Sequence, residues 1–272
     1  MHRKPEFMIF AMLAATLLTS DKVQAQAQEW GTVKGRIVWK DKDVPAPAVI
    51  ALPGANPAAA PCLQANKGAP PPDEKWVVNQ KNKGIKNTYV WLADFEDPKS
   101  KKPLPTHPKL KKIQDKDKEV VLDQPACCFM PHAIALREGQ VLVVKNSAPF
   151  QHNFKWTGNQ DTNPGGNVLL PVGASKKIDD LVADRLPVQM ECNIHPWMRG
   201  WIRIYSHPYF AVTDENGAFE FKDAPAGKFR IMIWHGSDGW RDGAKGNRGQ
   251  EINIKAAAVT DLGEQPSFPL AP

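Results

Sequence analysis

Residues 192–198 read Cys192-Asn193-Ile194-His195-Pro196-Trp197-Met198, so a thiol, an imidazole and a thioether fall within one short stretch. Two residues separate His195 from each sulfur-bearing residue, which lets one tight loop between strand ends direct all three side chains toward a common point. Two imidazoles, one thiolate and a weak axial methionine are the donors found in electron-transfer copper sites. The stretch therefore predicts a mononuclear copper site that needs one more imidazole.

The missing imidazole has one leading candidate. His152 lies in the run from Asn146 to Asn153, which follows an apolar run that predicts a strand. His132 is the alternative and stays open. The remaining histidines fit less well, because they lie in a lysine-rich stretch, in the C-terminal segment or near the first residue: His107, His207, His235 and His2. Taken alone, Cys192 is as easily half of a disulfide, but the joint spacing favours metal binding.

Short strands dominate the expected fold. Closely spaced runs with strand character, separated by glycines and prolines, occupy residues 119–122, 133–136, 141–146, 153–156, 188–192 and 201–205. A second set occupies residues 31–39, 87–95, 210–213, 219–222 and 229–234, and Asn216-Gly217 marks a hairpin turn. No segment has a convincing helical period, so we expect an all-β protein made of β-sandwiches. Residues 45–72 and 98–118 are expected to be irregular connections.

The central part of the chain resembles the cupredoxin family, the plastocyanin- and amicyanin-like blue-copper proteins. The resemblance lies in the order and spacing of Phe129-Met130-Pro131, Gly139-Gln140-Val141, Asn146, His152-Asn153, residues 192–200 and Ile202. It covers roughly residues 117–206 and implies a Greek-key β-sandwich with copper near one pole. By the same resemblance, Asn153 would tie the two ligand loops together and hydrogen-bond near the thiolate, where such contacts tune a metal's potential.

A second resemblance covers the flanking segments. Residues 213–221 and 224–229 are similar to carboxypeptidase regulatory-like (transthyretin-like) domains, and residues 31–38 resemble the first strand of that family. This implies a smaller immunoglobulin- or transthyretin-like β-sandwich into which the cupredoxin is inserted; two unrelated domains are the alternative. The expected boundaries are a signal peptide at 1–27, a β segment with long loops at 30–116, the cupredoxin at 117–206 and the regulatory-like domain at 207–264.

The neighbours of Cys192 bear on the kind of copper protein. Multicopper oxidases and copper nitrite reductases, as families, place a histidine beside the copper cysteine, whereas here the neighbours are Glu191 and Asn193. A binuclear centre would need a second cysteine in the loop, and there is none. We therefore expect no enzyme but a one-electron carrier with a single copper ion that alternates between Cu(I) and Cu(II). Copper binding or delivery without redox chemistry, and a structural protein whose site has lost its role, are the alternatives.

The partner is expected to be a redox protein such as a c-type cytochrome. In a cupredoxin the imidazole of the ligand loop is the ligand nearest solvent, which here is His195, and Pro196, Trp197 and Phe150 would give it an apolar rim. The lysines between Lys99 and Lys118 could steer an acidic partner toward that rim. The formal net charge of +6 is mild, and no basic helix is present, so nucleic acid is not expected to bind.

Four cysteines occur, and three of them are left after the metal site takes Cys192. In an oxidising compartment cysteines tend to pair. We expect a disulfide between Cys62 and Cys127, which would anchor the proline- and alanine-rich stretch to the edge of the copper domain. Pairing of Cys62 with Cys128 is the alternative.

The N-terminus indicates the compartment. Arg3 and Lys4 precede an apolar run from Phe7 to Leu18, and Ala25-Gln26-Ala27 follows it. This order is typical of a secretory signal peptide, and the apolar run is shorter than the roughly 20 residues that span a bilayer. We expect a periplasmic or secreted protein without a membrane span in the mature chain; an uncleaved anchor is the alternative.

Overall fold

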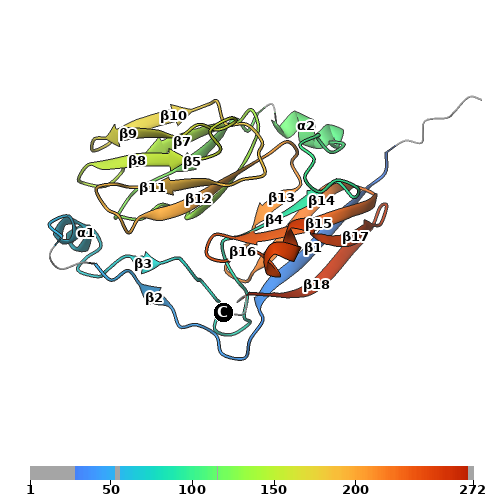
Figure 1. The fold of residues 1–272 in the computed structure, drawn as a ribbon, viewed down its shortest axis with the longest axis horizontal. Coiled ribbons are helices and arrows are strands. Elements are labelled where there is room, and N and C mark those ends of the chain that lie inside the picture. Colours follow the sequence, from blue (N-terminus) through green and yellow to red (C-terminus); the bar gives the residue numbers. More distant parts are fainter. Residues whose placement is uncertain (1–27, 53–55, 115, 269–272) are drawn as a thin grey trace, which may run out of the picture.

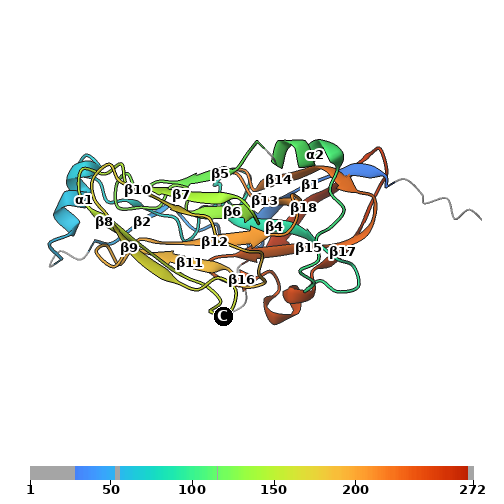
Figure 2. The same ribbon diagram turned by 90° about the horizontal axis from the view of Figure 1, so that it is seen from above.

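The computed structural model describes residues 28–52, 56–114 and 116–268 (Figure 1). The expected signal peptide lies outside these residues. The chain is all-β, which confirms the predicted fold class, and its strands form two units that lie beside each other along the longest axis of the molecule (Figures 1 and 2). No helix among the described residues has both the length and the apolar character needed to cross a membrane.

The central unit is formed by residues 119–205. Its two sheets have the strand orders β10-β7-β5 and β6-β12-β11-β8-β9. The pairs β5–β7 and β6–β12 are parallel, and the other pairs are antiparallel. Its core contains aliphatic side chains together with Phe129, Phe154 and the candidate sulfur donors. The strands are β5 (Glu119–Leu122), β6 (Ala133–Arg137), β7 (Val141–Lys145), β8 (His152–Thr157), β9 (Gly166–Leu170), β10 (Ser175–Ile178), β11 (Val188–Glu191) and β12 (Arg199–Tyr205).

The terminal unit combines strands from both ends of the chain. β1 lies between β14, to which it is antiparallel, and β18, to which it is parallel. The second sheet has the order β13-β4-β15-β16, and β17 also pairs with β15. The central unit is therefore framed in sequence by the strands of its neighbour. The strands are β1 (Trp30–Trp39), β4 (Thr88–Ala93), β13 (Phe210–Val212), β14 (Ala218–Pro225), β15 (Gly227–His235), β16 (Gly239–Trp240), β17 (Gln250–Ile254) and β18 (Val259–Ser267).

A cluster of aromatic side chains joins the two units. Tyr89 and Trp234 from the terminal unit pack with Ala133 and Tyr205 from the central unit. The Tyr89 hydroxyl donates to the backbone oxygen of Trp201 at 2.6 Å and accepts from the backbone N–H of Ile134 at 3.0 Å. Because this phenol is fully buried, both hydrogen bonds are formed away from water and hold the units in one arrangement.

Two segments expected to be irregular contain short helices. Residues 45–72 include β2 (Ala48–Val49), α1 (Ala59–Ala65) and the start of β3 (Pro72–Asp73), and the lysine-rich stretch contains α2 (Pro108–Gln114). A 3-10 helix, η1 (Gly243–Arg248), precedes β17. These helices have seven residues or fewer, too short for a periodic apolar face to show in the sequence.

Candidate metal centre

The candidate ligands come from two loops at one end of the central unit. His152 is the first residue of β8, Cys192 directly follows β11, and Met198 directly precedes β12. The backbone N–H of Met198 donates to the oxygen of His195 at 2.9 Å, and that of Cys192 donates to the oxygen of Met198 at 3.3 Å. These two bonds close residues 192–198 into the tight loop that the spacing predicts.

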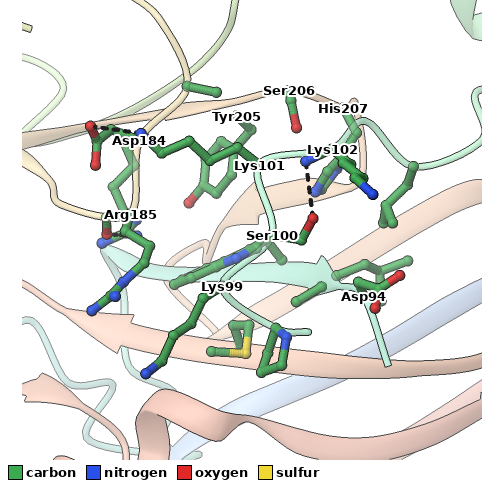
Figure 3. A pocket seen from close by; sticks show the side chains of 18 of the residues that line it. Asp94, Lys99, Ser100, Lys101, Lys102, Asp184, Arg185, Tyr205, Ser206 and His207 are labelled. Carbon is green, nitrogen blue, oxygen red and sulfur yellow. Dashed lines mark hydrogen bonds and ion pairs between the residues drawn. The ribbon is translucent and has the colours of Figure 1, made fainter. Parts of the chain in front are cut away.

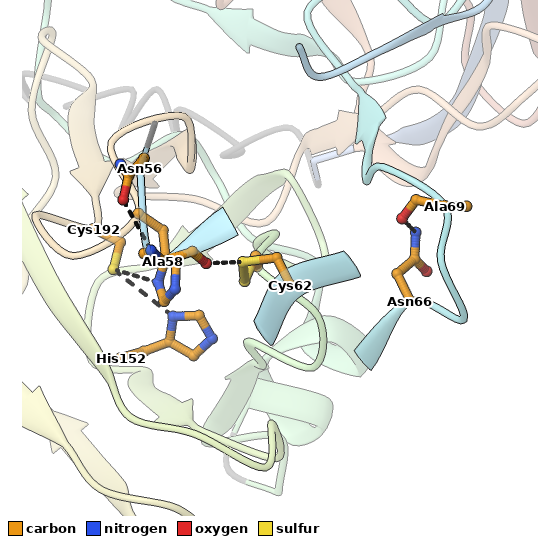
Figure 4. Close-up of a disulfide and its surroundings, with 9 residues drawn as sticks. Asn56, Ala58, Cys62, Asn66, Ala69, His152 and Cys192 are labelled. Carbon is orange, nitrogen blue, oxygen red and sulfur yellow. Dashed lines mark hydrogen bonds between the residues drawn. A yellow bond between two sulfur atoms is a disulfide. The ribbon is translucent and has the colours of Figure 1, made fainter. Parts of the chain in front are cut away.

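The cysteine sulfur faces both imidazoles. The Sγ atom of Cys192 lies 3.8 Å from Nδ1 of His152 and 3.6 Å from Nδ1 of His195 (Figure 4). For a first-row metal with bonds of 2.1 Å to nitrogen and 2.3 Å to sulfur, donors about 120° apart are separated by about 3.8 Å. The observed separations match, so the donor set fits a metal ion held in a trigonal arrangement.

Met198 packs in the same buried core as Cys192, whereas His132 lies outside the group of donors. Among the described residues, the cluster able to hold a metal around Cys192 contains His152 and His195. His132 instead lies beside Glu74, with its Nδ1 atom 4.0 Å from Oε2. Of the two histidines considered from the sequence, the structure brings His152 to the cysteine.

Asn153 connects the two ligand loops. Its Oδ1 atom accepts from the backbone N–H of Asn193 at 2.7 Å and of Ile194 at 3.2 Å. The same oxygen lies 3.3 Å from Sγ of Cys192, and the amide nitrogen donates to Asn167 on β9 at 2.8 Å. One side chain thereby fixes the start of the ligand loop relative to β8, because His152 and Asn153 are adjacent.

Burial sets the protonation states of the donors. It lowers the pKa of His195 to about 4, and together with the neighbouring His195 imidazole it lowers the pKa of His152 to about 3. Burial also raises the pKa of the Cys192 thiol, although hydrogen bonds around the loop act in the opposite direction. At neutral pH both imidazoles are therefore neutral and can donate a lone pair, and metal binding has to displace one thiol proton.

A disulfide-linked segment covers the site, which sequence reasoning did not anticipate. Cys62 of α1 is bonded to Cys127, and both sulfur atoms lie within 4.8 Å of a ring nitrogen of His195 (Figure 4). His195 is only 2% exposed. The expectation of a solvent-facing His195 is therefore wrong, because α1 and its disulfide occupy that side of the imidazole. We call residues 56–66 the cap.

The apolar rim expected around His195 is present beneath the cap. The ring centroids of Phe150 and Trp197 lie 5.6 Å and 5.5 Å from that of His195. Cys62 was recognisable as a disulfide partner, but its short helix leaves no periodic signal that would place it over the ligand loop. The remaining cysteine outside the metal site, Cys128, is free and partly buried.

The lysine-rich stretch lies away from the candidate ligands. α2 lies against the terminal unit, where Leu110 packs on its core, whereas α1 is at the far end of the central unit (Figures 1 and 2). Lys99, Lys101 and Lys102 line a pocket at the far end of β12 from Met198. Steering of a partner by these lysines onto the His195 rim is therefore not supported by the fold.

Comparison with known proteins gives a partial likeness. No family model and no curated protein matches the chain. Solved structures of amicyanin are similar to part of it: a reduced proline-to-phenylalanine variant and a reduced tryptophan-to-tyrosine variant at 16% identity, and a Cu(I) methionine-to-glutamine variant at 15%. Each covers 32% of this chain and 83% of the amicyanin chain, with a TM-score of 0.29. For this chain, the metal assignment depends on the donor geometry given above.

Proposed function

We propose that this protein is an exported copper protein that carries single electrons, with one copper ion held by His152, Cys192, His195 and Met198. The observation that carries the proposal is the buried cysteine sulfur facing two neutral imidazole nitrogens at 3.6 and 3.8 Å. When bound, copper supplies a one-electron couple between Cu(I) and Cu(II). The disulfide supports an oxidising compartment outside the cytoplasm.

The chain's own contribution is to hold the donors still. Strand ends and the Asn153 hydrogen bonds fix the two loops, and the Phe150 and Trp197 rings pack around His195. Contacts around the ligands keep them oriented, so the site can change oxidation state with little movement. Such a site suits electron transfer. The same burial opposes copper delivery, the alternative function, since a copper acceptor could not reach ligands that are at most 2% exposed.

The test is the visible spectrum of the copper-loaded, oxidised protein. Direct thiolate coordination gives an intense charge-transfer band, and we expect Cys192→Ser to abolish it. Cys128→Ser is the matched control, because it removes the other free thiol, which is not a candidate ligand, and it should keep the band. Loss of colour in the control, or colour retained without Cys192, would refute the ligand assignment.

The carrier function needs a second measurement. Cyclic voltammetry should give a reversible one-electron wave, and stopped-flow mixing with a c-type cytochrome should give electron exchange. Copper that is bound but transferred whole to a chelating protein, without a reversible wave, would instead support copper delivery. The redox protein partner remains part of this proposal.

A further inference from the structure

A small pocket lies between the two units beside the lysine-rich stretch (Figure 3). Its volume of about 60 Å³ exceeds the roughly 10–15 Å³ that one water needs, so it has room for a few waters or one small ion. Basic residues outnumber acidic ones in its lining: Lys99, Lys101, Lys102, Arg185 and Arg203 against Asp94 and Asp184.

The most deeply buried of these charges has no acidic partner. The Arg203 side chain stacks on the ring of Trp91 at 4.4 Å and lies near Trp234 and Trp240, and its Nη2 atom donates to the backbone oxygen of Arg185 at 2.8 Å. Its Nε and Nη1 atoms have no hydrogen-bond partner, and no carboxylate of the described residues forms an ion pair with it. Aromatic stacking offsets part of the cost of burying this charge, but it leaves those N–H groups unsatisfied.

A second buried donor lines the same pocket. The O–H of Tyr205 has no hydrogen-bond acceptor, and the residue is 5% exposed. Burial raises the pKa of this phenol, and the nearby Arg203 charge acts in the opposite direction. The Arg203 guanidinium also acts on this phenol as a hydrogen-bond donor, and the neutral phenol keeps its own O–H to donate, so the floor of the pocket presents buried donors from both side chains. Such a set is complementary to an anion.

The Asp184 carboxylate does not serve as the anion for these donors, because its oxygens already accept hydrogen bonds from other groups. They accept hydrogen bonds from Thr162, from Asn159 at 3.0 Å and from the backbone N–H of Leu186 at 3.0 Å, and Lys101 lies at 3.4 Å. Burial raises the pKa of this carboxyl, but the hydrogen bonds outweigh it and bring the pKa to about 2. The carboxylate thus neutralises Lys101 and leaves the exposed Lys99 and Lys102 on the rim without an ion pair in the described residues.

We propose that this pocket binds a small oxyanion of phosphate size. Arg203 and Tyr205 would donate from the floor, and Lys99 and Lys102 would close over the ion from the rim (Figure 3). A planar guanidinium suits several oxygens of one anion, and a lysine suits a point charge. Free inorganic phosphate and the phosphoryl end of a small molecule share this chemistry, and the experiment separates the two sources. The site is independent of the proposed copper function, because none of its residues is a candidate ligand.

The test is isothermal titration calorimetry of the full mature protein, loaded with copper, with inorganic phosphate at constant ionic strength set by chloride. We expect saturable binding of one ion. The double variant Lys99→Gln/Lys102→Gln should weaken it roughly tenfold, as loss of two solvent-exposed charge contacts implies. Lys176→Gln, which removes an exposed lysine of β10 on the central unit, is the matched control and should bind as the parent does.

The remaining measurements test the contribution of the guanidinium and identify the source of the anion. Arg203→Lys keeps the charge but removes the planar fork, and binding should be lost; where this variant fails to fold, the lysine variants still decide. Sulfate should compete with phosphate and acetate should not. Competition by glycerol 3-phosphate at similar affinity would assign a phosphoryl end group, and its failure would assign the free ion. No saturable heat, equal affinity in the double lysine variant, or equal competition by acetate overturns the proposal and leaves a pocket filled by water.

Discussion

The effect of Met198 on the proposed copper site can be separated from its effect on core packing. Met190 on β11 is also fully buried in the central unit, but it is not a candidate ligand. We expect Met198→Gln to keep the colour and to lower the reduction potential, because the weak axial donor tunes the potential. Met190→Leu, which nearly conserves volume, should leave the potential unchanged. Voltammetry of both variants checks this, and equal potentials would remove Met198 from the ligand set.

The buried His207 makes the stability of the fold depend on pH. Burial lowers its pKa to about 4, although a backbone hydrogen bond with Leu92 acts in the opposite direction, and its Nδ1 atom accepts from the backbone N–H of Tyr209. Between that value and the ordinary pKa of about 6.5, the unfolded chain binds more protons than the folded one. Its neutral state therefore stabilises the fold above pH 6.5, and this contribution is lost as pH falls to about 4.

The shift of His207 corresponds to about 3 kcal/mol of unfolding free energy. We expect His207→Asn to reduce the difference in stability between pH 7.5 and pH 4.5 by an amount of that order. Urea unfolding of the metal-free protein at both pH values measures it. An unchanged difference would mean that protonation of His207 does not limit acid stability.

At the scale of elements, we expect the cap to restrict access to the candidate metal centre. Cys62 of α1 and its partner Cys127 lie against His195, and the chain-entropy model gives about 4 kcal/mol for a disulfide that closes a loop of this length. We expect Cys62→Ser/Cys127→Ser to lower stability by about that amount and to expose His195. Oxidation of the reduced copper protein by a protein oxidant should then become faster relative to oxidation by ferricyanide.

The matched control for the cap is Cys128→Ser, which leaves the disulfide intact. Its ratio of the two rates should equal that of the parent protein. A visible spectrum of each variant establishes that the copper site has formed before rates are compared. Equal ratios in the control and the double variant would show that the cap does not restrict protein partners.

The elements also show what the sequence could and could not predict. The tight loop at 192–198 and the β8 start at His152 carry strong local signals, since donor spacing and strand ends are both short-range properties. β9 was missed because Leu169 faces solvent between Val168 and Leu170, which breaks the alternation of apolar and polar residues, and β10 because Lys176 and Lys177 occupy its centre. The disulfide between Cys62 and Cys127 was predicted, but the packing of α1 against His195 is a long-range contact that leaves no periodic trace in the sequence.

At the scale of the whole molecule, the two units should unfold together. Tyr89 bridges them with two buried hydrogen bonds, and Arg203 from β12 packs on tryptophans of the terminal unit. Inter-domain contacts of independent modules are usually more polar than this aromatic cluster. A change in one core is therefore expected to weaken the other.

Tyr209→Phe tests this coupling from the terminal unit. The Tyr209 hydroxyl donates to the backbone oxygen of Pro105 at 2.9 Å and accepts from the backbone N–H of His107 at 3.1 Å, so its removal should cost about 1–3 kcal/mol. Hydrogen exchange should show equal losses of protection in the slowest amides of β15 and of β11, because only global opening exposes them. Ile178→Val in the central unit is the reciprocal change, with an expected cost of roughly 0.5–1.5 kcal/mol in both strands. A loss confined to the strand of the altered unit would show that the interface holds two independently folding units.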